Sequence, residues 1–120
     1  MREQTLRIWA ANERELVTII NVYAPHSGIV SENPEELQNF YNELDQTYRA
    51  VLNDSTLSQL IICGDFNSRV GKSGAEECVG SYVKGSRNEN GKALVDFCTL
   101  NNLFISNTAF EHPMKHIRTW

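Results

Sequence analysis

The stretch that decides the fold is LIICGDFNS, residues 60–68. Four apolar residues run directly into a glycine, and two short polar side chains, Asp65 and Asn67, follow two positions apart. A short apolar run bounded by turn residues is typical of a strand covered on both faces. Ligands of open α/β sheets bind where such strands end. We therefore expect a functional site at Asp65 and Asn67.

Two apolar segments precede this motif. Apolar side chains alternate along residues 6–11 and recur in 16–25 (LVTIINVYAP), with a polar turn between them. This pattern predicts two strands joined as a hairpin. Pro25 would end the second strand because proline lacks a backbone donor. The following segment, 26–33 (HSGIVSEN), has the composition of a loop.

A helix is predicted from Pro34 to about Leu52. Asn33 is the expected N-cap, and two glutamates follow near the positive end of the helix dipole. Apolar residues then recur three and four positions apart. They define one apolar stripe, formed by Leu37, Phe40, Tyr41, Leu44, Tyr48, Val51 and Leu52.

The remaining segments continue the alternation of strands and helices. Residues 67–90 are glycine-rich and show no period, which predicts a long loop of the kind that often carries function. A second helix is expected over 93–100, and a strand over 101–110 (NNLFISNTAF). This order predicts an α/β fold, with residues 1–120 as one domain.

Composition and charge narrow the possible partners. The formal net charge of −4 argues against tight nonspecific binding to a polyanion. Residues 1–60 hold four basic and nine acidic side chains, whereas 61–120 hold seven and six, which weakly favours a phosphate-bearing partner for the second half. No signal peptide or membrane-length apolar run is visible, so we expect an intracellular, nuclear or cytoplasmic protein with no membrane partner. The oligomeric state stays open.

The cysteines and histidines indicate no special site. The three cysteines are odd in number and form no CxxC pair, so neither a disulfide framework nor a zinc site is indicated. Cys63 and Cys98 lie in apolar runs and are expected to be buried. No histidine follows an aspartate, and none is expected to act as a base: His26, His112 and His116.

Asp65 and Asn67 suit phosphate chemistry. Aspartate supplies negative charge for a metal, a water molecule or a histidine, and asparagine supplies neutral donors toward a phosphate oxygen. Phosphodiester hydrolysis with a divalent metal uses such a pair. The alternative is that Asp65 caps a turn through its own backbone, as aspartate often does. The tetrapeptide alone leaves both interpretations open.

Two other motifs fail on spacing. A phosphate-binding P-loop would need glycine where Phe66 stands. A calcium loop beginning at Asp65 would need an oxygen ligand and a glycine where Arg69 and Val70 stand. Neither site is therefore expected.

Several segments together resemble a known family. They are TIINVYAP, LIICGDFNSRVG, GSRNENGKALVDFCTLNNLFISNTAF and the closing RTW, and in this order they resemble the middle of an endonuclease/exonuclease/phosphatase domain. In particular they resemble the endonucleases of non-LTR retrotransposons and the related craniofacial development protein 2-like sequences. The resemblance implies a deoxyribonuclease I-like, four-layer sandwich of two stacked sheets flanked by helices, of which this chain would hold a part.

The resemblance also implies an activity and a site. The activity is magnesium-dependent attack of water on a phosphodiester, with DNA as the partner of the parent domain. By position, Asp65 would orient the nucleophilic water, and Asn67 would bind the phosphate. Tyr23 would place its hydroxyl near the scissile phosphate, and Thr119 would lie beside the substrate backbone. The structural alternatives are a strand-end aromatic residue for Tyr23 and a β-branched strand residue for Thr119.

The family pattern has parts that these residues do not show. It places a metal-binding glutamate before the strand of Tyr23, and a Ser-Asp-His with the general-base histidine after Thr119. We therefore expect a partial site, with its metal ligands unknown, that is inactive by itself. Three interpretations stay open: a partial retroelement DNA endonuclease, a phosphatase or lipid phosphodiesterase of the same fold, and a non-catalytic remnant or binding module.

Overall fold

The computed structural model describes residues 3–9, 16–54, 57–72 and 74–113. The chain divides into two compact units, Met1–Asn67 and Ser68–Trp120. Strands and helices are mixed, which confirms the predicted α/β class. No helix in the described part of the chain combines the length and the apolar character needed to cross a membrane.

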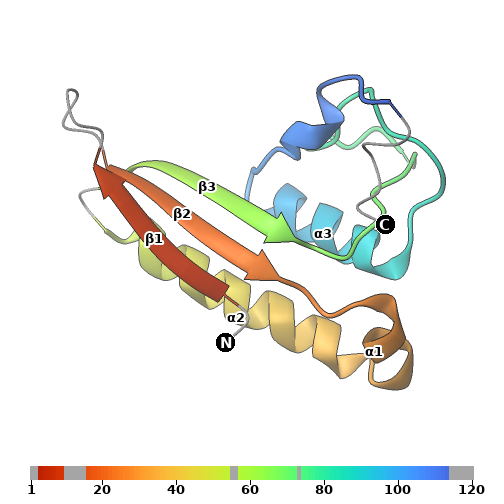
Figure 1. Ribbon diagram of the computed structural model, residues 1–120, viewed down its shortest axis with the longest axis horizontal. Coiled ribbons are helices and arrows are strands. Elements are labelled where there is room, and N and C mark those ends of the chain that lie inside the picture. Colours follow the sequence, from red (N-terminus) through yellow and green to blue (C-terminus); the bar gives the residue numbers. More distant parts are fainter. Residues whose placement is uncertain (1–2, 10–15, 55–56, 73, 114–120) are drawn as a thin grey trace. The chain divides into compact units, whose positions relative to one another are not determined.

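The first unit contains a three-stranded sheet. Strand β1 (Glu3–Trp9) pairs antiparallel with β2 (Leu16–Tyr23), which pairs parallel with β3 (Leu57–Asp65) (Figure 1). The antiparallel pairing of the first two strands is the predicted one. β3 is longer than the predicted run, because its pairing with β2 continues to Tyr23 and Asp65.

Helix α2 (Glu35–Leu52) runs along one face of this sheet (Figure 1). The predicted apolar stripe is confirmed except at its ends, since Leu37 is half-buried and Leu52 is 47% exposed. Burying a large apolar side chain contributes roughly 1.5–3 kcal/mol. The core of this unit joins α2 to alternate residues of β2, and its members are Thr18, Ile20, Val22, Phe40, Tyr41, Leu44, Tyr48 and Val51.

The prediction of a loop before α2 was wrong. A short helix, α1 (Ser27–Glu32), lies there. Nδ1 of His26 accepts hydrogen bonds from two backbone N–H groups of its first turn, at 3.1 and 3.4 Å. Asn33 ends α1 rather than capping α2, and the N-cap of α2 is Pro34, which offers no side-chain cap. A helix of six residues is too short to show a hydrophobic period, so the sequence pattern gives no signal for it.

The second unit contains the long loop, helix α3 (Glu89–Leu100) and a short 3-10 helix, η1 (Ser106–Thr108). The predicted second helix is confirmed but begins earlier, at Glu89. Asn88 caps it, with Oδ1 accepting a hydrogen bond from the N–H of Gly91 at 2.8 Å. The core of this unit includes Cys78, Leu94, Val95, Phe97 and Cys98.

The prediction of a strand over 101–110 was also wrong. The backbone turns at Asn102, whose φ is 53°. Ile105 makes an isolated parallel bridge to Val79, and the chain then coils into η1. There the hydroxyl of Thr108 donates to the carbonyl oxygen of Ile105 at 2.6 Å. These local hydrogen bonds replace the ladder that a strand would need.

The predictions for the two cysteines in apolar runs had different outcomes. Cys98 is buried, as predicted, and this burial, with Cys78 nearby, raises the pKa of its thiol to about 12. Cys63 was predicted to be buried but is exposed. Its register partner is Asn21, an exposed residue of β2. Ile61, two residues earlier on β3, is 48% exposed, so the expectation that this strand is covered on both faces was wrong as well.

These exposures lead to a thiol-labelling prediction. We expect iodoacetamide to alkylate Cys63 in the native protein, and Cys78 and Cys98 only after unfolding, because the reactive species is an accessible thiolate. Mass spectrometry of the alkylated peptides measures the three rates. Native labelling should disappear in Cys63→Ser. Labelling of Cys98 as fast as that of Cys63 would contradict its burial.

Candidate functional site

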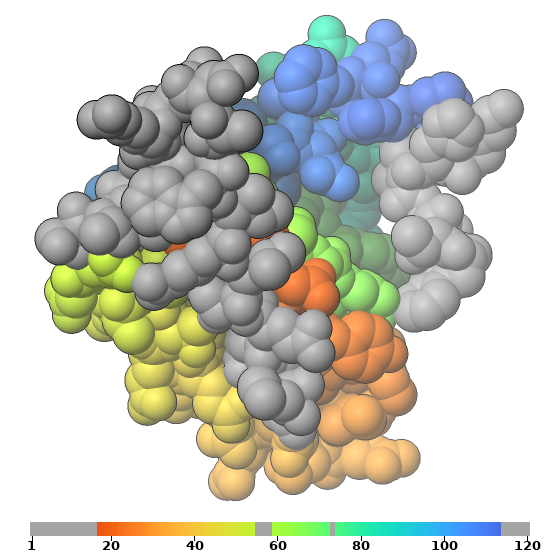
Figure 2. All heavy atoms as spheres, turned by 60° about the vertical axis from the view of Figure 1, so that its left-hand side comes forward, coloured from red at the N-terminus to blue at the C-terminus, as the bar shows by residue number. Residues whose placement is uncertain are grey.

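Polar residues singled out in the sequence meet in the first unit, where β2 and β3 end. Tyr23 and Asp65 are partners in the parallel register. The two strands run in the same direction in Figure 1, and Figure 2 shows orange and green atoms, from the segments that hold β2 and β3, next to one another on its face. The N–H of Ala24 donates to the carbonyl oxygen of Asp65 at 2.8 Å. The candidate site is therefore at the carboxyl edge of two parallel strands, where α/β proteins bind ligands.

The side chain of Asp65 stabilises the turn that follows β3. Its Oδ1 accepts a hydrogen bond from the N–H of Asn67 at 2.9 Å, which is the turn-capping alternative raised from the sequence. The side chain is half-buried, and its second oxygen has no hydrogen-bond partner among the described residues. One carboxylate oxygen thus supports the fold, and the other is available to a ligand or to water.

Asn67 ties the two strand ends together. Its Nδ2 donates to the carbonyl oxygen of Ala24 at 2.8 Å, and we call this bond the Asn67–Ala24 clip. Ala24 is fully buried, so the clip anchors the end of β3 to a fixed point of the core. The φ of Asn67 is 46°, in the left-handed region that asparagine tolerates better than most residues. No hydrogen bond to a described residue uses its second amide hydrogen or its amide oxygen, so both can serve a ligand.

A series at Asn67 separates the contributions of the clip and of the backbone. Asn67→Gly removes the hydrogen bond but permits the positive φ, so we expect a loss of about 1 kcal/mol in the free energy of unfolding. Asn67→Ala adds backbone strain, and we expect about 2–3 kcal/mol. Urea unfolding followed by circular dichroism measures both values. A glycine variant as stable as the parent would show that the clip contributes nothing.

The structure also describes Tyr23 and two of the three histidines, but not Thr119. Tyr23 is 60% exposed, so its hydroxyl is accessible at the same strand edge. Thr119 lies outside the described residues, as does His116. His26 caps α1 through Nδ1, and His112 is half-buried in the second unit. The strand-edge site therefore brings together Tyr23, Asp65 and Asn67.

The described residues do not fit a divalent metal site by themselves. No group of three or more His, Cys, Asp or Glu side chains gathers in the described ranges. Magnesium is bound in octahedral geometry by about six oxygen atoms, some of them from water or phosphate. Within the described ranges, Asp65 is the carboxylate that the strand-edge site contributes. What the described residues can do is orient a water molecule and hydrogen-bond a phosphate oxygen.

Sequence reasoning missed an ion pair in the second unit. Arg87, which no motif of the sequence singles out, donates to Glu76 at 2.6 Å. It also donates through Nε to the carbonyl oxygen of Val70 at 2.7 Å. This hydrogen bonding lowers the pKa of the Glu76 carboxyl below its usual 4.5. The two residues are far apart in sequence, so no local pattern could have paired them.

The Glu76–Arg87 pair predicts a pH dependence of stability. Because the pKa of Glu76 is lower in the folded chain, the pair stabilises the fold fully above the unfolded pKa. This stabilisation is lost as the pH falls below 4.5 and passes through the lowered folded value. Urea midpoints measured from neutral to acidic pH test it. The acid-side decline should be shallower in Glu76→Gln, and an identical decline would contradict the prediction.

Comparison with known proteins gives a family. Residues 17–119 match the sequence model of a family described as endonuclease-reverse transcriptase. Craniofacial development protein 2 of Tragulus javanicus and of Bos taurus are each 34% identical to the chain over 104 residues. The match covers 87% of this chain and 17% of each relative, so the chain spans less than a fifth of their length. No solved structure gives a significant match.

Proposed function

Because the chain belongs to the endonuclease-reverse transcriptase family, within the endonuclease/exonuclease/phosphatase superfamily, we propose that it forms part of a retroelement-derived domain that hydrolyses DNA phosphodiesters. The observation that carries this proposal is the meeting of Tyr23, Asp65 and Asn67 at the ends of two paired parallel strands. The family description, which joins an endonuclease to a reverse transcriptase, supports the retroelement origin. In this proposal the sheet and α2 are two layers of a four-layer sandwich within a single domain.

In this proposal, each of the three side chains uses a polar atom that can reach a ligand. The free oxygen of Asp65 orients the attacking water, and the second amide hydrogen of Asn67 binds a phosphate oxygen. The exposed hydroxyl of Tyr23 hydrogen-bonds the same phosphate. Donors held in place by the fold stabilise developing charge without reorganisation, and the clip provides that rigidity. Thr119 would contact the neighbouring substrate backbone.

Magnesium is the proposed cofactor of the complete domain. A bound divalent ion would polarise the phosphate and lower the pKa of water. Asp65 could be one of its ligands, and the others would have to be residues beyond the described ones. We therefore propose that the 120-residue chain has no turnover by itself.

Nicking of supercoiled plasmid in magnesium tests the proposal. We expect none from the 120-residue chain. In a polypeptide of the relatives' length, we expect nicking that Asp65→Asn lowers at least about 100-fold, as loss of one stabilising group in an active site typically does. Glu43→Gln, on the exposed side of α2, removes the same charge and should have no effect. Nicking unaffected by Asp65→Asn would refute the assigned site.

A non-catalytic module is the second candidate, and one observation favours it. Both Asp65 and Asn67 already make hydrogen bonds that support the fold. This candidate predicts duplex binding without nicking in the long polypeptide, measured by fluorescence anisotropy. Release of inorganic phosphate from inositol phosphates without nicking would instead support a phosphatase of the same fold.

A further inference from the structure

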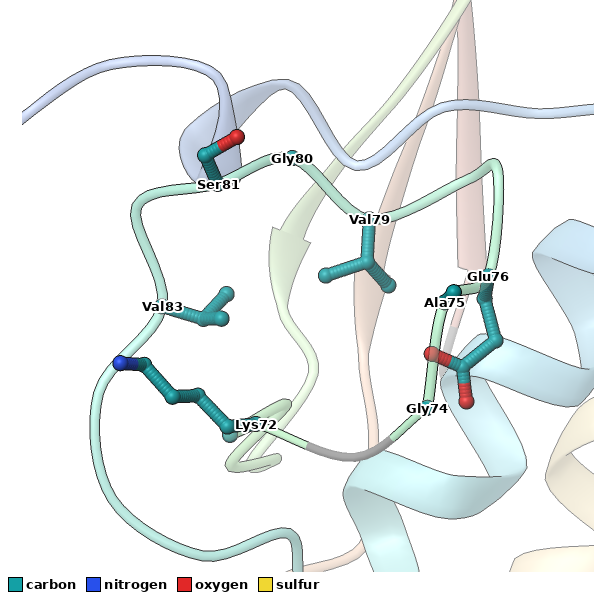
Figure 3. Close-up of a pocket in the computed structure, with 9 residues that line it drawn as sticks. Lys72, Gly74, Ala75, Glu76, Val79, Gly80, Ser81 and Val83 are labelled. Carbon is teal, nitrogen blue, oxygen red and sulfur yellow. The ribbon is translucent and has the colours of Figure 1, made fainter.

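The loop of the second unit surrounds a hollow of about 240 Å³ (Figure 3). Residues between 71 and 83 line it, and it shares no residue with the strand-edge site. In Figure 3 the side chains of Val79 and Val83 point into the ring of the loop. Pockets for drug-sized ligands measure roughly 300–1,000 Å³, so an occupant of this hollow would be a smaller molecule.

Hydrogen bonds to the rest of the unit hold this loop in shape. The N–H of Gly80 donates to Oγ1 of Thr108 at 2.6 Å, and Val79 bridges to Ile105. The N–H of Lys72 donates to the carbonyl oxygen of Gly85 at 3.0 Å. A hollow that exists before binding spares a ligand the cost of ordering the loop.

The charges around the hollow do not cancel. Glu76 is held by both terminal nitrogens of Arg87, at 2.6 and 3.3 Å, which compensates its charge. Lys72 is exposed, and its ammonium has no partner among the described residues. In Figure 3 its side chain extends toward Val83, away from Glu76. One positive charge is thus left at one side of the hollow, and an acceptor carboxylate lies at the other.

We propose that this hollow binds a phosphorylated sugar, as found in a nucleoside monophosphate or at the end of a DNA strand. The ammonium of Lys72 pairs with the phosphate. Val79 and Val83 contact the apolar face of the sugar, and the carboxylate of Glu76, oriented by Arg87, accepts a hydrogen bond from a sugar hydroxyl. This binding goes beyond the proposed hydrolysis and uses neither Asp65 nor any other residue of the strand edge.

Nuclear magnetic resonance titration tests the proposal. The ¹⁵N-labelled chain is titrated with thymidine monophosphate, and we expect saturable shifts of the amides that line the hollow. Thymidine and inorganic phosphate should each bind about tenfold more weakly, because each lacks one recognised group. Lys72→Gln should weaken binding about tenfold. Lys92→Gln makes the same charge change on an exposed position of α3 and should bind like the parent.

A second variant covers the case in which Lys72→Gln fails to fold. Ala75→Leu, at an exposed residue lining the hollow, fills it without changing a charge and should abolish binding. Equal binding of thymidine, or binding unchanged in both Lys72→Gln and Ala75→Leu, would overturn the proposal. So would loss of the shifts in Asp65→Asn, which would place the ligand at the strand edge.

Two further measurements identify the source of the phosphate and test the hollow separately from the proposed hydrolysis. Tighter binding of a 5′-phosphorylated oligonucleotide than of the monophosphate supports a DNA end as the ligand, and equal binding supports a free nucleotide. Absence of monophosphate binding in a chain whose longer form nicks plasmid refutes the hollow alone. Monophosphate binding without nicking refutes only the proposed hydrolysis.

Discussion

Gly64→Ala should lower the free energy of unfolding of the first unit by about 4 kcal/mol or more. The φ of Gly64 is 130°, a conformation available to almost no other residue. A Cβ at this position would lie 2.0 Å from the carbonyl oxygen of Val22 and 2.7 Å from its nitrogen. Both are backbone atoms of the paired strand β2, and they cannot move aside as the end of a flexible side chain could. The variant must separate β2 from β3 where the candidate site is built.

A matched control isolates the steric part of this effect. Gly85 also has a positive φ, 76°, but nothing lies within 4 Å of a Cβ built on it. Gly85→Ala should therefore cost only the conformational strain, about 1–2 kcal/mol. Urea unfolding followed by far-ultraviolet circular dichroism compares the two variants with the parent. Equal losses for the two variants would show that the approach of the strands at Gly64 is not tight.

Gly91→Ala should destabilise the second unit by about 3 kcal/mol, against ordinary helix propensity. Replacing glycine by alanine inside a helix normally stabilises it by about 1 kcal/mol. Here a Cβ would lie 1.8 Å from the carbonyl oxygen of Arg69, which also accepts the N–H of Asn88 at 3.2 Å. Oδ1 of Asn88 in turn accepts the N–H of Arg69 at 2.9 Å. The extra methyl group would separate the start of the long loop from the cap of α3.

The control for this variant is the next residue of the helix. Lys92 is exposed, and Lys92→Ala should change the free energy of unfolding by less than about 0.5 kcal/mol. Thermal unfolding, with urea unfolding as a second probe, measures both variants. A Gly91→Ala protein more stable than the parent would show that α3 follows propensity and that the loop does not pack against it.

The elements that the sequence predicted correctly are those with a long or continuous apolar pattern. Helix α2 shows the expected stripe because its core side chains recur over several turns. The run at 60–63 predicted β3, and the rule that ligands bind at strand ends predicted a site at Asp65 and Asn67. Tyr23 was added by the family resemblance, and the structure makes it the register partner of Asp65. Their roles in hydrolysis stay predictions.

The elements that the sequence missed depend on single hydrogen bonds between side chains and backbone. Helix α1 begins where His26 accepts two N–H groups, although histidine is not a preferred cap. The segment near Thr108 coils because its hydroxyl bonds to the chain three residues earlier. At the site, the acceptor of the clip is the backbone carbonyl of Ala24. Every residue has such a carbonyl, so the sequence does not indicate which one will accept the bond. Such contacts depend on individual atoms, whereas sequence patterns report averages over many residues.

The parallel pairing of β2 with β3 has a consequence for the order of events during synthesis on the ribosome. β1 and β2 are close in sequence and can pair early, whereas β3 emerges only after the whole of α2. Until then one edge of β2 offers unpaired N–H and carbonyl groups to any passing strand. The growing chain is therefore most prone to wrong strand pairing in this interval. The interval ends when Asn67 leaves the exit tunnel and its bond to Ala24 can form.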